Sequence, residues 1–441
     1  MQSTFVQLYK YWCGRTTTPA RFDEWGAISL VAAAAEERVY CEHETANPIY
    51  PNLYTLFLAP SGVGKGAAIK RVESLVRSHP SWSSQALYVG KMTGQALVDW
   101  MSGRTQSSVR RVNGFQLPTS QAYGPKHPAA YVLNEELALD IGRKAMADDF
   151  VKYMTGLYDG PRVWFDGTRT NGIVELSDVR INWLAASTRA WLHGSLTADA
   201  ISGGFFGRTY VIDEAACDER QRFAPYKPSD HEEVFQILTR LVAILRDVKG
   251  EIVVDRAVRQ ALQMYLDERT TPESEDPIAP WWRRELVHLY KLIMVAALSE
   301  WCCEMALWED DGGVAQPPPL VAQMRHLQVA HRALRDVNKV IPNLLAESVE
   351  TREMRMARQA AILIRRNKRL AHSDLLKAVW RQGNAAVVNA AVALLEQQGL
   401  VETTFEGGDS HGAHRYLEYH WIGGTRVRLA NLLNRKMDES S

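Results

Sequence analysis

Apolar residues occur along this chain in two patterns, short continuous runs and repeats with helical spacing. Continuous runs bounded by turn residues are typical of strands buried on both faces, whereas repeats of three to four residues predict amphipathic helices. The runs are residues 53–59, 86–89, 129–134, 181–186 and 210–212, and the first helical repeat places Ala68, Ile69, Val72 and Val76 on one face. Strands interleaved with helices in this way predict an α/β fold.

The pattern changes after the last of these runs. Helical periodicity predicts helices at 232–248, 255–269, 282–307 and 320–343. The final part predicts three short helices, at 358–366, 373–381 and 384–398, then a hairpin of 401–405 and 415–421, which is the order of a winged helix-turn-helix. We therefore predict a helical N-terminal segment (1–45), an α/β core (46–215), a helical subdomain (216–345), a winged helix-turn-helix domain (355–421) and a basic C-terminal tail (422–441).

A glycine-rich turn, APSGVGKG at residues 59–66, joins the first strand to the first helix. Glycines let backbone N–H groups face an anion, the helix N-terminus adds its positive dipole end, and a lysine reaches the outer phosphates. Ala59 takes the first glycine position of the usual motif and Gly66 replaces the hydroxyl residue that holds Mg²⁺, which weakens the metal-binding part of the prediction. A plain turn would not explain the lysine. We predict that ATP is bound by Ser61, Gly62, Val63, Gly64, Lys65, Gly66 and Ala67.

Two carboxylates, Glu135 and Glu136, follow the buried run 129–134. In a nucleoside triphosphatase one such carboxylate orders the Mg²⁺ shell and the next polarises the attacking water. The alternative is that the pair only complements a helix dipole, which would be the better interpretation without the upstream lysine. We predict that Glu135 holds Mg²⁺ through water and that Glu136 positions the nucleophile.

Basic residues gather in two places that could contact nucleic acid, and a predicted hairpin lies between them. The polar segment 103–128 contains Arg110 and Arg111 and is either an insert that faces a polyanion or a solvated excursion. Residues 160–178 predict a hairpin whose turn contains Arg169 before Asn171-Gly172. Residues 355–381 contain one acid, Asp374, and eight basic residues: Arg355, Arg358, Arg365, Arg366, Lys368, Arg369, Lys377 and Arg381. This excess suits phosphate contacts, although winged helices also serve as protein contact modules.

Composition is that of a globular protein, with 46% hydrophobic and 23% charged residues, and it includes no low-complexity block. The 51 basic and 51 acidic residues balance, so global charge favours no class of partner. Five cysteines without C-x-x-C spacing indicate neither a disulfide framework nor a zinc finger. The first residues lack a signal-peptide pattern, and Glu300 and Glu304 interrupt the longest apolar stretch, 292–308, so we expect a cytoplasmic protein without a membrane partner.

The order of these parts resembles an AAA+ ATPase of the kind found in phage, plasmid and mobile-element replication proteins, similar to MCM-type and superfamily 3 helicases. The motifs that carry the resemblance are APSGVGKG, LNEEL at 133–137, the hairpin before LAAST at 184–188, GGFFGRTYVI at 203–212 and RRELVHLYKL at 283–292. It covers roughly residues 22–343, and the winged helix is consistent with it. Gly66 and Glu135 depart from the pattern, although nucleotide kinases tolerate a G-K-G loop.

The resemblance implies specific roles. Thr188, with Ser187 beside it, would sense the γ-phosphate, and Arg208 would be the finger inserted into a neighbouring subunit's site. Arg283 or Arg284 would give a sensor-two phosphate contact, and 216–345 would form a lid over the nucleotide. Arg169 at the hairpin tip would line a pore and hold single-stranded DNA.

These roles predict a ring-forming, ATP-driven DNA helicase that acts in replication of a mobile element. We expect the ring to be a homo-oligomer, a hexamer, with a possible primase or initiator as partner. One alternative is a non-translocating AAA+ switch, such as a helicase loader or transposition regulator. Another is a small-molecule kinase with a DNA-binding tail, for which the sequence offers no sign of an acceptor pocket.

Overall fold

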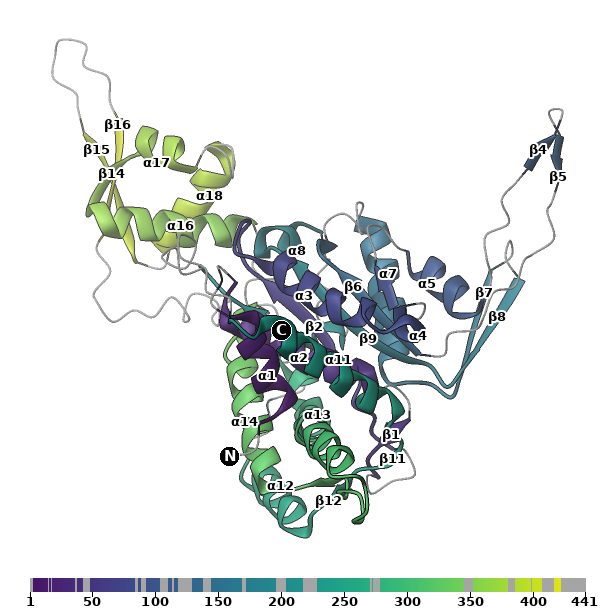
Figure 1. Ribbon diagram of the computed structural model, residues 1–441. Helices are drawn as coiled ribbons and strands as arrows, with labels where there is room; N and C mark the ends of the chain where they lie inside the picture. The colour runs from purple at the N-terminus through teal and green to yellow at the C-terminus, as the bar shows by residue number, and fades with distance from the viewer. Residues whose placement is uncertain are drawn as a thin grey trace, which may run out of the picture. The chain divides into compact units, whose positions relative to one another are not determined.

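The structure is a computed structural model. It describes residues 3–421, except for 15, 17, 36–37, 43–47, 84–85, 89–92, 104–109, 113–114, 118–128, 138–143, 169–171, 196–203, 217–227, 270–271, 273–277, 345–351, 380–384, 398 and 407–415. The chain divides into two compact units, Met1–Leu345 and Ala346–Ser441, which are described separately below (Figure 1).

The first unit is built on a five-stranded parallel sheet. Its strands lie in the order β10 (Thr209–Asp213), β2 (Tyr54–Leu58), β9 (Arg180–Ser187), β6 (Ala129–Asn134) and β3 (Ala86–Tyr88). β2, β6 and β9 are buried along their whole length, which explains why their sequences are continuous apolar runs. The mixed α/β architecture predicted from these runs is therefore confirmed.

Helices cover both faces of this sheet. Phe57 of β2 stacks on Phe22 of α2 (Ala20–Ala35), with ring centroids 4.6 Å apart, whereas the Tyr54 hydroxyl donates to the Met154 carbonyl of α7 (Lys144–Tyr158). Residues three apart on a strand point to opposite faces, so α2 and α7 lie on opposite sides of β2. α3 (Lys65–Arg77) packs against α2, because a Cβ at Gly26 would lie 3.1 Å from Val72.

The predicted N-terminal segment belongs to the core of the first unit. α1 (Phe5–Cys13) and α2 contribute buried residues to the same hydrophobic cluster as the sheet. β1 (Val39–Tyr40) pairs in parallel with β11 (Gly250–Glu251), and β12 (Val253–Val254) with β13 (Val321–Ala322). These four two-residue strands were not predicted, because pairs this short leave no period in a sequence.

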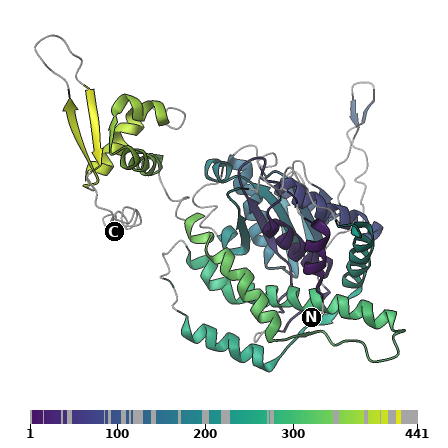
Figure 2. The same ribbon diagram turned by 60° about the vertical axis from the view of Figure 1, so that its left-hand side comes forward.

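The helices predicted between 216 and 345 are confirmed with shifted ends. They are α11 (His231–Asp247), α12 (Arg256–Glu268), α13 (Ala279–Asp310) and α14 (Met324–Asn338), and both views show α12 to α14 gathered below the sheet (Figure 1, Figure 2). α13 is the one helix in the described ranges long and apolar enough to cross a membrane, yet 67% of its most apolar window is buried inside the fold. That burial is typical of a core helix.

Two antiparallel hairpins belong to the first unit. β7 (Val163–Thr168) pairs with β8 (Gly172–Ser177), which confirms the predicted hairpin, and Figure 1 shows the pair beside α5 (Gly94–Met101). β4 (Arg110–Val112) pairs with β5 (Phe115–Leu117) within the long polar segment. The inner face of β7–β8 buries Val174 and Leu176, while Phe165 and Ile173 on its outer face are 65% and 71% exposed.

The second unit has its own small core. α16 (Arg352–Asn367), α17 (His372–Val379) and α18 (Ala385–Gln397) precede the hairpin β15 (Val401–Glu406) and β16 (Tyr416–Trp421). A strand that was not predicted, β14 (Arg369–Ala371), pairs with β16 to complete a three-stranded antiparallel sheet. The predicted helices and hairpin are confirmed, and the predicted tail 422–441 lies outside the described residues.

Candidate nucleotide-binding site

The glycine-rich turn leaves the carboxyl end of β2 and enters α3. Gly62 and Gly64 both have φ near +85°, a region that side chains other than glycine rarely adopt. A Cβ at Gly64 would also lie 2.9 Å from Thr18 Oγ1, so the segment before α2 packs against the turn. Gly64 is therefore required both by its backbone conformation and by its neighbour.

Lys65 is the first residue of α3, and its side chain folds back over the turn. Its Nζ donates to the carbonyls of Ala59 (2.7 Å) and Pro60 (2.8 Å). Partial burial lowers the pKa of Lys65, while the nearby Glu136 carboxylate acts in the opposite direction. The ammonium thus lies on the inside of the turn, beside the α3 N-terminus whose N–H groups attract anions.

Gly66 and Glu135, which both depart from the family pattern, lie side by side. A Cβ added at Gly66 would lie 3.3 Å from Oε2 of Glu135, closer than most such contacts. The same carboxylate oxygen lies 3.4 Å from Nζ of Lys70, one turn further along α3. A carboxylate oxygen therefore borders the place where a side chain at 66 would begin.

Glu136 is held by the strand that precedes it. Asn134, at the end of β6 and 1% exposed, accepts a hydrogen bond from the Glu136 backbone N–H through Oδ1 (3.0 Å). Both Glu135 and Glu136 are exposed, in contrast to the buried strand. The buried amide thus fixes the turn from which the two carboxylates project.

The end of β9 adds hydroxyls next to the turn. β9 is the neighbour of β2, with Leu58 paired to Ser187, whose carbonyl accepts from Ala59 N–H (3.4 Å). Ser187 is 2% exposed, and its Oγ has no hydrogen-bond partner among the described polar atoms. Thr188 Oγ1 accepts from Trp191 N–H (3.2 Å) at the start of α8 (Arg189–Ser195), which leaves its O–H able to donate.

Arg208 and Arg284 lie at the opposite end of the sheet, where the amino ends of the strands meet. Arg208 ends the 3-10 turn Phe206–Arg208 immediately before β10, and β10 pairs with β2 from Thr209–Tyr54 to Asp213–Leu58. At about 3.3 Å per residue along the strand, the backbone of Arg208 is roughly 17 Å from the carboxyl end of β2, which leads into the turn with Lys65. Asp159 accepts from Arg208 Nη2 (2.6 Å) and from Arg284 Nη1 (2.9 Å).

Within the predicted lid, the helix α13 contacts the opposite end of the sheet from the glycine-rich turn. Lys291 of α13 donates to the carbonyl of Asn52, which precedes β2, and His288 bonds the carbonyl of Gly207, which precedes β10. Both contacts are at the amino ends of the strands. α13 therefore packs at the edge opposite the glycine-rich turn, and Arg284 contacts the same carboxylate as the proposed finger.

Some residues around the turn gave no signal in the sequence. Asn134 read only as the end of a strand, and Thr18 lies more than forty residues before the glycine that it contacts. Arg189 pairs with Asp213 at the carboxyl end of β10, joining two strand ends. Long-range packing brings Thr18 to Gly64 and Arg189 to Asp213, and such packing cannot be read from a single sequence.

The candidate nucleic-acid residues are distributed over both units. Arg169 and Arg381 lie outside the described residues, and Arg110 and Arg111 lie on β4. The second unit exposes five of the basic side chains, on α16, on β14 and the residue before it, and on α17: Arg365, Arg366, Lys368, Arg369 and Lys377. Lys377 pairs with Asp374 (3.1 Å), and Arg365 and Arg366 are in the last turn of α16, where cations complement the helix dipole.

The chain was also compared with known proteins. A scan against protein-family models and a search of curated proteins each found no match.

Proposed function

We propose that this chain is an ATP-hydrolysing P-loop ATPase of the AAA+ type. The observation that carries the proposal is the convergence of Lys65, the Glu135–Glu136 pair and Ser187 at the carboxyl ends of β2, β6 and β9, with β9 between the other two. Ligands of open parallel sheets bind at this edge. A cation for phosphate and carboxylates for metal and water are groups that phosphoryl transfer to water uses.

Each residue has a distinct part in the proposed reaction. The turn and Lys65 hold the phosphates. Thr188, whose Oγ1 accepts from Trp191 N–H and can still donate its O–H, offers a hydroxyl to the terminal phosphate, with the buried Ser187 beside it. Glu136 orients the attacking water. Glu135 fits as the Mg²⁺ ligand, directly or through water, because its carboxylate borders position 66, where the usual motif has a hydroxyl. A Mg²⁺ ion held there would neutralise phosphate charge.

The position of Arg208 supports a ring. Arg208 is about 17 Å along β10 from the turn of its own subunit, so in a ring it would act on the turn of a second copy. To do so it would leave Asp159 and the Gly204 carbonyl, which hold its guanidinium here. Arg284 shares the same carboxylate, so both arginines would act on that second copy. Planar guanidinium groups suit such a role because they bind phosphate oxygens in a bidentate manner.

Movement along DNA as a replicative helicase is our proposal for what hydrolysis drives. The hairpin β7–β8 supports it, because its outer face exposes Phe165 and Ile173, and exposed aromatic rings can stack on bases of single strands. A non-translocating AAA+ switch uses the same site without strand separation. A small-molecule kinase would need no second copy, and it leaves the position of Arg208 unexplained.

A second candidate function applies to the second unit. α18, the helix that would enter a groove in a helix-turn-helix, contains no Lys or Arg and one acid, Glu396. Its exposed positions are mostly small, including Ala385, Ala386, Asn389 and Ala390. Base reading by this helix is therefore disfavoured, and the second unit would bind DNA phosphates through α16 and β14 or bind a protein partner.

Mixing two inactive variants tests the ring. Arg208→Ala should keep nucleotide binding and lose ATP hydrolysis by about 10³ or more, because a finger acts on the transition state. Lys65→Ala should lose nucleotide binding but still carry Arg208. Adding Lys65→Ala chains to Arg208→Ala chains should restore part of the ATPase rate, because an intact turn then meets an intact arginine.

Glu136→Gln is the matched control. It should bind nucleotide and lose turnover. A mixture of Glu136→Gln and Arg208→Ala chains should recover less ATPase activity than a mixture of Lys65→Ala and Arg208→Ala chains. The reason is that Glu136→Gln chains keep their nucleotide bound without hydrolysing it, which holds the neighbouring copies in one state. If mixed assemblies form and remain as inactive as either parent, Arg208 does not act on a second copy. If Glu136→Gln hydrolyses ATP at the wild-type rate, the assignment of that carboxylate is wrong.

A further inference from the structure

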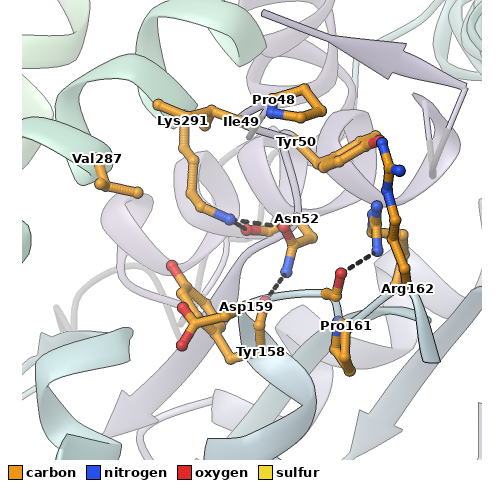
Figure 3. Close-up of a pocket in the computed structure, with 12 residues that line it drawn as sticks. Pro48, Ile49, Tyr50, Asn52, Tyr158, Asp159, Pro161, Arg162, Val287 and Lys291 are labelled. Carbon is orange, nitrogen blue, oxygen red and sulfur yellow. Dashed lines mark hydrogen bonds between the residues drawn. The ribbon is translucent and has the colours of Figure 1, made fainter. Parts of the chain in front are cut away.

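A cavity of about 450 Å³ opens at the amino ends of β2 and β9, the edge of the sheet opposite the glycine-rich turn (Figure 3). It is lined by the segment before β2, the end of α7, the start of β9 and one face of α13. Its volume is within the range of small-molecule sites. None of the residues assigned above to the nucleotide lines it.

Lys291 of α13 supplies a buried cation to this cavity. It is 4% exposed, and its Nζ donates to the carbonyl (2.9 Å) and to Oδ1 (2.6 Å) of Asn52, as Figure 3 shows. The ammonium also lies 4.5 Å from the centre of the Tyr158 ring. All of these partners are neutral, whereas a buried charge is usually paired with an opposite charge.

Arg180, the first residue of β9, supplies a second buried cation. It is 3% exposed, and its Nη1 donates to the carbonyls of Gly160 (2.7 Å) and Val179 (2.6 Å). Its guanidinium lies 3.7 Å from the centre of the Tyr50 ring, and its Nε has no partner among the described atoms. Gly160 is needed here, because a Cβ would lie 2.5 Å from Nη1.

Charge in the cavity is therefore unbalanced. Asp159 is the one carboxylate among the lining residues, and it already accepts from Arg208 and Arg284, which lie next to the cavity. Arg162 adds an exposed cation to the lining, and the Tyr158 hydroxyl is buried without a partner among the described atoms. Two arginines, a buried lysine and an unused hydroxyl donor thus line a space whose carboxylate is occupied.

We propose that this cavity is a second anion site, in which Lys291 and Arg180 bind a small molecule of the phosphate class. Fixed donors in a partly enclosed, low-dielectric site bind oxyanions more strongly than the same groups in water. The site is separate from the glycine-rich turn, and it requires neither ATP hydrolysis nor a ring. The bound phosphate group could belong to a small molecule free in solution or to a nucleotide held by another copy of the chain. We propose the small molecule free in solution.

The test uses the full chain with Lys65→Ala, so that the glycine-rich turn does not contribute. Calorimetric titration at a protein concentration where the chain is monomeric should show one site for inorganic phosphate or pyrophosphate. Lys291→Met, which keeps the volume, should weaken binding at least tenfold, and Arg162→Ala at the exposed lining should weaken it several-fold. Lys339→Met, an exposed lysine on a different surface, is the matched control and should bind as the parent does.

A second measurement separates charge from packing. Burial, with smaller effects from Arg180 and Arg284, lowers the pKa of Lys291 to about 7, and Asp159 acts in the opposite direction. An anion favours the charged lysine, so binding at pH 8 should take up protons. Sulfate, which does not titrate near pH 8, should bind with an enthalpy that depends on the ionisation enthalpy of the buffer, and this dependence should vanish in Lys291→Met.

Three outcomes would overturn the proposal. One is absence of binding by phosphate and pyrophosphate at millimolar concentration, and another is equal binding by the parent and Lys291→Met. The third is binding that appears only after a second copy loaded with nucleotide is added, because the anion would then be that nucleotide. None of these outcomes bears on whether the turn around Lys65 hydrolyses ATP, which the mixing experiment decides separately.

Discussion

Gly66 and Glu135 form the most informative residue pair, because each replaces the residue usual at its position and the two lie within contact. Gly66→Thr should lower the affinity for Mg²⁺–nucleotide about tenfold, because the new side chain meets the carboxylate 3.3 Å from its Cβ. Glu135→Asp should lower it similarly, because the shorter arm loses its reach. The double variant restores the usual hydroxyl and aspartate and should bind better than either single variant.

Fluorescent-nucleotide titrations of the wild type, the two single variants and the double variant measure these affinities without relying on activity. The four affinities should differ when Mg²⁺ is present and nearly coincide when it is absent. Additive losses in the double variant would show that Gly66 and Glu135 are independent. Ala378→Ser, at an exposed position of α17 in the second unit, is the matched control for adding a hydroxyl to a helix and should leave the affinities unchanged.

His288 predicts how stability changes with pH. It is fully buried, bonds the Tyr210 hydroxyl (2.9 Å) and the Gly207 carbonyl (3.0 Å), and stacks on Trp281. Burial lowers its pKa from 6.5 to about 3, so between these values the unfolded chain binds the extra proton. Stability should therefore fall as pH drops below about 6.5, by about 1.4 kcal/mol per unit.

Urea unfolding of the wild type and His288→Phe at pH 7, 6 and 5 measures this contribution. The wild type should lose more stability per pH unit than the variant, by the equivalent of about one proton. Because His326 also has a lowered pKa and is present in both proteins, its contribution cancels in the comparison. Parallel curves for the two proteins would show that His288 is not the titrating group.

At the scale of elements, the second unit gives a prediction about charge. Replacing Arg365, Arg366, Lys368 and Arg369 by Gln should weaken DNA binding. It should also reduce the slope of log affinity against log salt by about 0.9 for each phosphate that the variant no longer neutralises. Fluorescence anisotropy over a salt series measures the slope, and Lys339→Gln in the first unit is the control. An unchanged slope would assign the second unit to a protein partner.

Elements were predicted from the sequence more completely than their neighbours in space. The buried strands and most helices were visible as apolar runs and helical repeats, and the β7–β8 hairpin was visible through Asn171-Gly172. The turn around Lys65 and the carboxylate pair were likewise visible as local motifs. Arg284 was expected to contact phosphate but lies with Arg208 on Asp159, 125 residues away along the chain. Only long-range packing of α13 on the amino ends of the sheet determines that arrangement.

At the scale of the whole molecule, the groups at the two ends of the strands predict that copies of the chain assemble into an oligomer. One edge carries the groups proposed for the nucleotide and the other carries Arg208, so a bound nucleotide would link one copy to the next. Sizing with a slowly hydrolysed ATP analogue should show a discrete oligomer, which we expect to be a hexamer. Lys65→Ala should remain at its nucleotide-free size, and an unchanged wild type would remove the ring from the proposal.

The pairing of β2 with β10 has a mechanical consequence. The turn around Lys65 is the direct continuation of β2, and Arg208 directly precedes β10, with five pairs of residues in register between them. Hydrogen-bonded neighbouring strands are stiff, so a shift of the turn by a fraction of an ångström would be passed along them with little loss. In a ring, the paired strands would couple the nucleotide site of one copy to that of the next. Such coupling favours ATP hydrolysis in sequence around the ring over independent hydrolysis at each site.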